Sequence, residues 1–186
     1  MEILFCFGAI FVFVVAIVVA AIALYNRLIV LRNRVENAWA QIDVQLKMRY
    51  DLIPNLVATV KGYAAHESQT LESVIAARQV AIDAKGVAAQ AQAENALTST
   101  LRSLFAVAEA YPDLKANQNF LMLQQELSNV EQKVAYARQF YNDSVMSFNI
   151  AIQSFPANLI AGVFGFSARE PFEIEEEAKT APKVEF

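Results

Sequence analysis

The sequence predicts an all-α protein in which an N-terminal transmembrane helix continues into an antiparallel, elongated four-helix bundle. The first observation is an uncharged apolar run over residues 3–24, because an α-helix needs about 20 such residues to cross a bilayer core of ~30 Å. The second is the scarcity of helix-breaking residues, with five glycines and five prolines in 186 residues. The third is an apolar pattern with steps of three and four residues along the remaining chain.

Residues 1–25 are interpreted as a membrane anchor that is retained. A cleaved signal peptide is the alternative, but it has a basic start and an apolar region of about 7–15 residues, whereas this chain begins with Met1 and Glu2. Small residues let neighbouring helix backbones approach, although alanine is also simply common in anchors. We expect Tyr25 at the level of the lipid headgroups. We expect the anchors to self-associate through Gly8, Ala9, Ala16 and Ala20.

The basic residues predict the orientation of the chain in the membrane. No lysine or arginine precedes the apolar run, whereas Arg27, Arg32 and Arg34 follow it closely. Such residues mark the cytoplasmic side of a transmembrane helix, and they suit an anionic inner leaflet. We therefore expect a single-pass protein of the cytoplasmic (inner) membrane, with its N-terminus outside and the bulk of the chain in the cytoplasm.

A heptad pattern extends the first helix beyond the membrane, to about residue 49. No glycine or proline separates the apolar run from this pattern, whose members are Leu28, Leu31, Val35, Ala38 and Ile42. Trp39 lies about 22 Å beyond Leu24 on such a helix, which is too far for the aromatic belt at the membrane surface. We therefore expect Trp39 to pack against another helix.

Three further helices are expected. Asp51 can cap a second helix over residues 52–83, with Pro54 in its first turn, where proline is tolerated. Gly86 marks the next turn, and a third helix follows over residues 88–110. The fourth helix starts near Phe120, has the most regular apolar spacing and ends at Pro156.

The chain should return to the membrane after the fourth helix, because short connections make successive helices antiparallel. Residues 26–156 would then form a cytoplasmic helical bundle. Residues 157–168 are apolar, so we expect them at the membrane-proximal end of the bundle or in the lipid interface. Ordinary capping of the bundle core is the equal alternative. The apolar side chains of this region are Phe155, Leu159, Ile160, Phe164 and Phe166.

The net charge of −4 arises from residues 170–186, within the acidic tail of residues 169–186, because the chain before Glu170 has 13 acidic and 13 basic residues. We predict a disordered tail that points away from an anionic leaflet. The run Glu175–Glu177 could gather calcium loosely, but it lacks the ligand spacing of a calcium loop. A balanced charge on the rest of the chain argues against a nucleic-acid partner.

Reactive groups are too sparse to predict an enzyme, a cofactor or a metal site. His66 is the single histidine, and the single cysteine, Cys6, lies in the anchor. We interpret Asp51, Pro54 and Asn55 as structural residues. Arg49 and Arg138 are expected to pair with an acidic residue near helix ends, where buried pairs can fix register without adding much stability. Asn142 is expected at a helix–helix seam.

Several segments of the sequence resemble the LemA family. They are Tyr25–Leu28, Arg32–Trp39, Gln41–Lys47, Arg49–Val57, Lys61–Ala64, Tyr111–Asn117, Asn119–Leu121, Arg138–Asn142 and Phe155–Phe166. The resemblance covers roughly residues 20–168 and implies a bacterial membrane protein with an outward N-terminus and a helical cytoplasmic domain. Its signature includes Trp39, Arg49, Asp51, Pro54, Asn55, Arg138 and Asn142. It implies no activity, although roles in membrane remodelling, envelope stress or signalling have been suggested for relatives.

Two functions follow as predictions. The first is a non-enzymatic scaffold that self-associates and organises or remodels the inner leaflet, with the lipid bilayer and further copies of the chain as partners. The second is a monomeric adaptor or signalling subunit that docks a membrane or cytoplasmic protein in envelope stress. An enzyme would have to rely on scattered carboxylates, which the sequence does not favour.

Overall fold

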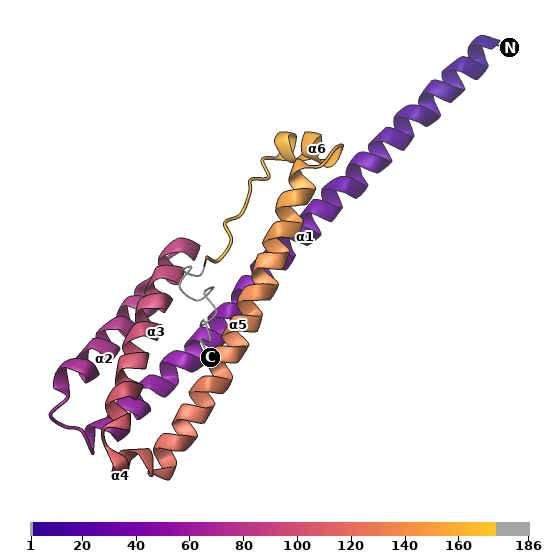
Figure 1. Ribbon diagram of the computed structural model, residues 1–186. Coiled ribbons are helices and arrows are strands. Elements are labelled where there is room, and N and C mark those ends of the chain that lie inside the picture. Colours follow the sequence, from indigo (N-terminus) through magenta and orange to yellow (C-terminus); the bar gives the residue numbers. More distant parts are fainter. Residues whose placement is uncertain (1, 174–186) are drawn as a thin grey trace, which may run out of the picture.

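The structure is a computed structural model that describes the backbone of residues 2–173 and the side chains of residues 7–173. Within this part of the chain all regular secondary structure is helical, which confirms the all-α prediction (Figure 1). The helices are α1 (Glu2–Lys61), α2 (Ser68–Asp83), α3 (Val87–Glu109), α4 (Pro112–Lys115), α5 (Gln118–Gln153) and α6 (Ala157–Phe164).

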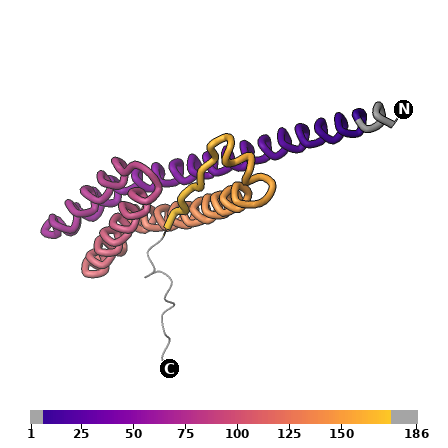
Figure 2. The backbone as a smooth tube through the Cα atoms, turned by 90° about the horizontal axis from the view of Figure 1, so that it is seen from above, coloured from indigo at the N-terminus to yellow at the C-terminus, as the bar shows by residue number. Residues whose placement is uncertain are grey.

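Helix α1 has two parts that differ in their surroundings. Its first part projects alone from the rest of the molecule, as Figures 1 and 2 show, and all side chains over residues 7–20 are exposed. It is the one helix in the described chain that is long and apolar enough to cross a membrane. The second part, from Leu28 onward, packs against the other helices. The apolar run therefore continues into the folded domain without a break, as predicted.

The end of α1 differs from the prediction. We expected the first helix to end near residue 49 and Asp51 to cap a second helix, but α1 continues to Lys61 and contains Pro54. A proline inside a helix leaves the carbonyl four residues earlier without its usual donor. Here Arg78 Nε of α2 donates to the freed Tyr50 carbonyl oxygen at 2.7 Å. The second helix is correspondingly shorter than predicted and begins at Ser68.

Helices α1 and α5 pack side by side as a long antiparallel pair. Residue numbers fall on α5 as they rise on α1, because surface hollows along this pair are lined jointly by residues of both helices. The joint lining residues are Leu28 with Ala151, Val44 with Ala137, and Thr59 with Met122. Helices α2 and α3 form a shorter hairpin that covers only the end farthest from the N-terminus (Figure 1). A four-helix bundle along the whole length is therefore not confirmed.

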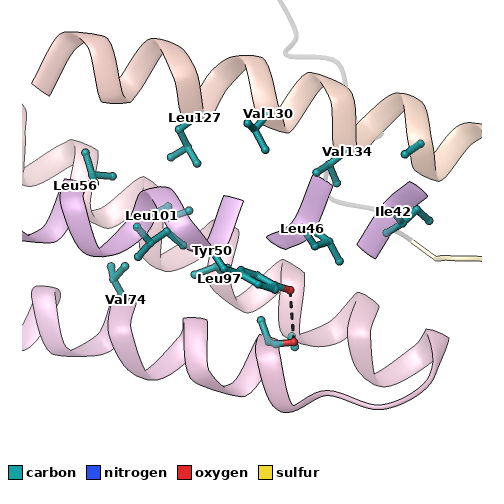
Figure 3. Close-up of a cluster of buried hydrophobic side chains, with 14 of the residues drawn as sticks. Ile42, Leu46, Tyr50, Leu56, Val74, Leu97, Leu101, Leu127, Val130 and Val134 are labelled. Carbon is teal, nitrogen blue, oxygen red and sulfur yellow. Dashed lines mark hydrogen bonds between the residues drawn. The ribbon is translucent and has the colours of Figure 1, made fainter. Parts of the chain in front are cut away.

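The core follows the apolar stripes of the long helices. The buried residues of α1 include Val35, Ala38, Ile42, Leu46, Ile53, Leu56 and Val60. Figure 3 shows Leu127, Val130 and Val134 of α5 pointing toward the side chains of α1 and α3. Steps of three and four residues put one side chain per turn on the same helix face, which is why the pattern read from the sequence coincides with the buried stripe.

The remaining helix boundaries have local causes. Gly86 adopts φ +86°, a conformation that glycine tolerates at no steric cost, and α3 begins one residue later. Pro112 occupies the first turn of the short helix α4 instead of simply ending α3. The Asn117 side chain caps α5 by accepting a hydrogen bond from the Phe120 N–H at 3.0 Å. The predicted third and fourth helices match α3 and α5 closely.

The chain turns back after α6. Gly165 ends this helix in the left-handed conformation, with φ +70°. Residues 166–173, which we call the strap, then run without helix along α1 and α5 toward the α2–α3 hairpin, as Figure 1 shows. We predicted that a disordered tail would begin at residue 169, but Arg169, Glu170 and Phe172 are hydrogen-bonded to α5 and the Phe172 side chain is buried. Residues 174–186 of that prediction lie outside the described part of the chain.

Candidate functional site

One end of the folded domain is apolar and exposed. It is formed by α6 and by the turn of α1 around Tyr25, whose ring lies 4.7 Å from the Phe164 ring and 5.9 Å from the Phe166 ring. The side chains of Leu159 and Val163 are 61% and 79% exposed and share one face of α6. This end therefore presents an apolar surface beside the point where the apolar half of α1 emerges.

The other predicted residues of this region are arranged around the same end. Phe155 is exposed before α6, Ile160 is half-buried, and Phe166 packs under Arg32, whose Cζ atom lies 5.7 Å from the ring centroid. Arg27 and Arg34 are exposed on α1. The structure thus gathers the juxtamembrane basic residues and the apolar segment 157–168 into one neighbourhood, which neither motif alone could indicate.

The small residues of the anchor face no other part of the described chain. Gly8, Ala9, Ala16 and Ala20 are all exposed on the projecting half of α1. Ala9, Ala16 and Ala20 are spaced by seven and four residues, which places them on one face of the helix. An exposed face of this kind is the geometry that allows close helix–helix approach in a bilayer.

A buried polar cluster lies where all four long helices meet. Its centre is Glu94 of α3, which is 0% exposed. Arg49 of α1 donates to Glu94 Oε2 at 2.6 Å, to Thr98 Oγ1 at 2.9 Å and to Glu131 Oε1 at 3.1 Å. Arg138 of α5 brings its Nη2 within 3.5 Å of Glu94 Oε2. Two cations and two carboxylates are therefore held together, with Glu131 at the exposed edge.

Tyr50 completes this cluster on the side of α2. Its hydroxyl donates to Glu94 Oε1 and accepts from Gln90 Nε2 at 2.9 Å. The dashed line in Figure 3 joins the same hydroxyl to the Ala81 carbonyl oxygen at 3.5 Å. Burial raises the pKa of the Tyr50 hydroxyl well above its usual value, and the hydrogen bond to Glu94 adds to the rise because it favours the neutral phenol.

The cluster fixes how the helices fit together. Burial lowers the pKa of the Arg138 guanidinium, while the nearby Glu94 carboxylate opposes this shift. A buried charge needs partners. Arg49 has hydrogen-bond acceptors on α3 and α5, and Arg138 meets Glu94 of α3 at ion-pair distance. The surface hollows along α1, α2 and α5 described here are lined by other residues. The geometry of the cluster therefore supports a structural role, that of setting helix register.

The outcome for the predicted polar residues is mixed. Arg49 and Arg138 do pair with an acidic residue, but they meet Glu94 in the middle of the helices instead of at their ends. Asp51, Pro54 and Asn55 are exposed on α1. Asn142 binds the strap and not a neighbouring helix. Trp39 packs edge-on against Tyr141 of α5 at 5.4 Å.

Sequence reasoning missed Glu94 and Gln90. The signal was present, because the stripe Leu97, Leu101, Leu104 and Ala108 extends backward by steps of three and four to these two residues. Polar residues that continue an apolar stripe indicate a buried polar cluster. Among residues 7–173, no group of three or more histidine, cysteine, aspartate or glutamate side chains is arranged to hold a metal ion.

Comparison with known proteins shows the family. The family model described as LemA family matches residues 38–186. The magnetosome protein MamQ 2 of Paramagnetospirillum magneticum is 23% identical over 197 residues, which cover 92% of this chain and 72% of that protein. Protein LemA of Metamycoplasma hominis is 26% identical over 140 residues, covering 73% of this chain and 63% of that protein. Since the family model covers most of the chain, the protein belongs to the LemA family.

Proposed function

We propose that this chain is a non-enzymatic scaffold of a bacterial cytoplasmic membrane. The apolar half of α1 crosses the bilayer once with the N-terminus outside, and the packed helices lie in the cytoplasm. Copies assemble side by side and organise or remodel the inner leaflet. The observation that carries this proposal is the meeting, at one end of the molecule, of a helix that is apolar on all sides and an exposed apolar face of α6.

The position of α6 supports contact with lipid. A short helix with an exposed apolar face suits the boundary between headgroups and acyl chains, and α6 lies beside Tyr25 at the end of the apolar run. Arg27 and Arg34 are exposed one to three turns beyond, where an anionic leaflet would attract them. Together these residues favour an interfacial position over simple capping of the core.

Depth-dependent quenching tests this placement. A tryptophan introduced by Leu159→Trp, in a chain whose native tryptophan is removed by Trp39→Phe, should be strongly quenched by brominated lipids. Met122→Trp in the same background is the matched control, because Met122 is exposed at the far end of α5. Equal quenching at the two positions would contradict an interfacial α6.

The face formed by Ala9, Ala16 and Ala20 supports self-association. Without a hydrophobic driving force between helices in lipid, association depends on close packing at small residues. This face is exposed along the projecting half of α1. Because α1 continues as one helix through Tyr25, helices that associate in the bilayer would also hold their packed domains side by side.

Mass photometry in mild detergent tests assembly directly. We expect particles larger than a monomer. The double substitution Ala16→Leu with Ala20→Leu should lower the association constant at least tenfold and so increase the monomer fraction. Val14→Leu with Val18→Leu is the matched control, since these residues lie on the opposite face. A strictly monomeric population of the unmodified chain at all concentrations would count against the scaffold.

Cysteine accessibility tests the orientation. In a Cys6→Ser chain that carries Lys183→Cys, a membrane-impermeant thiol reagent should label the new cysteine only after the cells are opened. A Cys6→Ser chain that carries Glu2→Cys in place of Lys183→Cys should be labelled in intact cells. The reverse pattern would overturn the cytoplasmic placement of the packed helices.

The second candidate function, a monomeric adaptor or signalling subunit, is favoured by a separate observation. The α1–α5 pair has an open surface hollow of about 560 Å³ that is lined in part by Val44, Tyr136 and Phe140. The Tyr136 side chain is 72% exposed. A partner protein could use such a surface. An adaptor predicts that a photo-cross-linker at Val44 captures one partner and that Tyr136→Ala abolishes capture without changing the copy number.

A further inference from the structure

The strap is bound to α5 by two asparagine side chains in the same way. Asn142 Nδ2 donates to the Phe172 carbonyl oxygen at 3.1 Å, and its Oδ1 accepts from the Phe172 N–H at 2.8 Å. Asn149 repeats this pair of hydrogen bonds with Arg169, at 2.8 and 2.9 Å. Each amide thus satisfies both main-chain groups of one strap residue, as a neighbouring β-strand would.

The spacing of the two asparagines fits an extended chain. Residues seven apart on a helix are separated by about 10.5 Å along its axis. Three residues of extended chain, from Arg169 to Phe172, span about 10 Å. The two lengths agree, so the backbone of the strap can engage both amides at once. Pro171 lies between the two bonded residues, where its missing N–H costs no hydrogen bond.

One side chain of the strap provides an anchor. Phe172 is 2% exposed and packs between the Trp39 ring, at 6.1 Å, and the Arg138 guanidinium, whose Cζ lies 4.5 Å from its centroid. The Tyr141 hydroxyl donates to the Glu170 carbonyl oxygen at 2.9 Å. By contrast, the Glu170 and Pro171 side chains are exposed. Apart from an exposed ion pair between Arg169 Nη2 and Glu36 Oε1 at 3.7 Å, recognition of residues 169–173 therefore depends on the main chain and one aromatic side chain.

We propose that this face of α1 and α5 is a binding site for an extended peptide with one aromatic anchor, and that residues 169–173 occupy it as an internal ligand. A peptide of the same chemistry in another chain can displace them. The site differs from the lipid-facing end and from the buried cluster around Glu94. Its occupancy also decides whether Arg138, at the edge of that cluster, is covered by an aromatic ring.

Fluorescence anisotropy with a labelled peptide of residues 166–173 tests the proposal on the full-length chain in detergent. Phe172→Ala in the protein removes the internal anchor, and we expect this variant to bind the peptide at least tenfold more tightly than the unmodified chain. A peptide with alanine in place of its last phenylalanine should not bind. Equal binding of the peptide by the two proteins would overturn the proposal.

The asparagine pair provides the second arm of the test. Adding Asn142→Asp to the Phe172→Ala chain keeps one oxygen acceptor but removes the N–H donor, so we expect peptide binding to fall at least tenfold. Asn129→Ala is the matched control, because Asn129 lies on α5 and its side chain accepts from Gln125 instead. Peptide binding that is indifferent to Asn142→Asp would contradict main-chain recognition.

Hydrogen exchange in the unmodified chain keeps the test decisive if a variant does not fold. The amides of Arg169 and Phe172 are bonded to asparagine oxygens and should exchange slowly. An excess of the unlabelled peptide should speed their exchange several-fold, whereas the alanine peptide should not. Unchanged exchange at a saturating peptide concentration would show that the strap is a permanent part of the fold, and would refute the proposal.

Discussion

The two halves of α1 have the same backbone and opposite surroundings. Over residues 7–20 every side chain is exposed and apolar or glycine, whereas beyond Leu28 a single stripe is buried and the rest faces water. A helix that is apolar on all sides needs an apolar solvent, while a helix with one apolar stripe needs a partner. The difference shows that the side-chain pattern alone can suit one half of a continuous helix to an apolar environment and the other half to packing in water.

The two halves also differ in how charge is treated. The first carries no charge from residue 3 to residue 24. The second places Arg49 at a position of its buried stripe, four residues before Ile53 and three after Leu46, and surrounds it with acceptors from α3 and α5. Desolvated charge is therefore avoided in one half and used for specificity in the other.

The largest test of this comparison removes the shared carboxylate. Glu94→Leu leaves Arg49 and Arg138 buried without their main acceptor, and we expect the free energy of unfolding to fall by about 3–5 kcal/mol. Thermal unfolding in mild detergent, followed by circular dichroism, measures this. Glu109→Gln, at an exposed ion pair with Lys115, is the control and should change the stability by less than about 1 kcal/mol.

A second test compares equivalent truncations in the two halves. Ile42→Ala creates a cavity in the packed stripe and should lower the stability of the folded domain by about 2–5 kcal/mol. Phe11→Ala removes more apolar surface from an exposed position and should leave that stability unchanged. Denaturant midpoints of the two variants decide the matter, and a comparable loss in both would show that the halves do not differ as described.

Pro54 and Arg78 provide a third test through their coupling. Arg78→Met removes the donor to the Tyr50 carbonyl oxygen and should cost about 1–3 kcal/mol. Pro54→Ala restores a main-chain N–H that can bond the same oxygen, so it should cancel most of that loss. A double-mutant cycle measures the coupling energy, and strict additivity of the two changes would exclude this explanation of the unbroken helix.

The smallest expected effect concerns pH. The pKa of Tyr50 is raised in the folded chain, so the folded state holds its proton more tightly than the unfolded state, whose pKa is near 10.0. The contribution of this phenol to stability is complete below about pH 10 and declines as the pH rises further. Stability should therefore fall less steeply above pH 10 in Tyr50→Phe than in the unmodified chain. Identical slopes would contradict burial of this hydroxyl.

The sequence predicted the features that depend on periodic burial. The apolar run, the buried stripes of α1 and α5, and the boundaries of α3 follow from local patterns that tertiary structure did not override. The break between α1 and α2 was misplaced because the local rule for proline near a helix start was applied at Pro54. Only the distant side chain of Arg78, which no local rule can place, makes the continuous helix acceptable.

The contacts that define the candidate sites could not be predicted for the same reason. Glu94 meets Arg49 across 45 positions of sequence, and Asn142 meets Phe172 across 30. Both pairings depend on which faces of separate helices come together. The asparagines at positions 142 and 149 do share a face of α5 by their spacing, but nothing in the local sequence identifies a main-chain segment as their partner.

The uninterrupted course of α1 makes it a lever. From Tyr25 to Lys61 the helix extends about 54 Å at 1.5 Å per residue. Membrane helices tilt over a range of about 0–40°. A change of only about 10° in the tilt of α1 would move the Lys61 end by about 9 Å. If α1 spans the bilayer as proposed, a bilayer that thickens, thins or curves would therefore move the α2–α3 hairpin sideways over a distance close to the width of a helix.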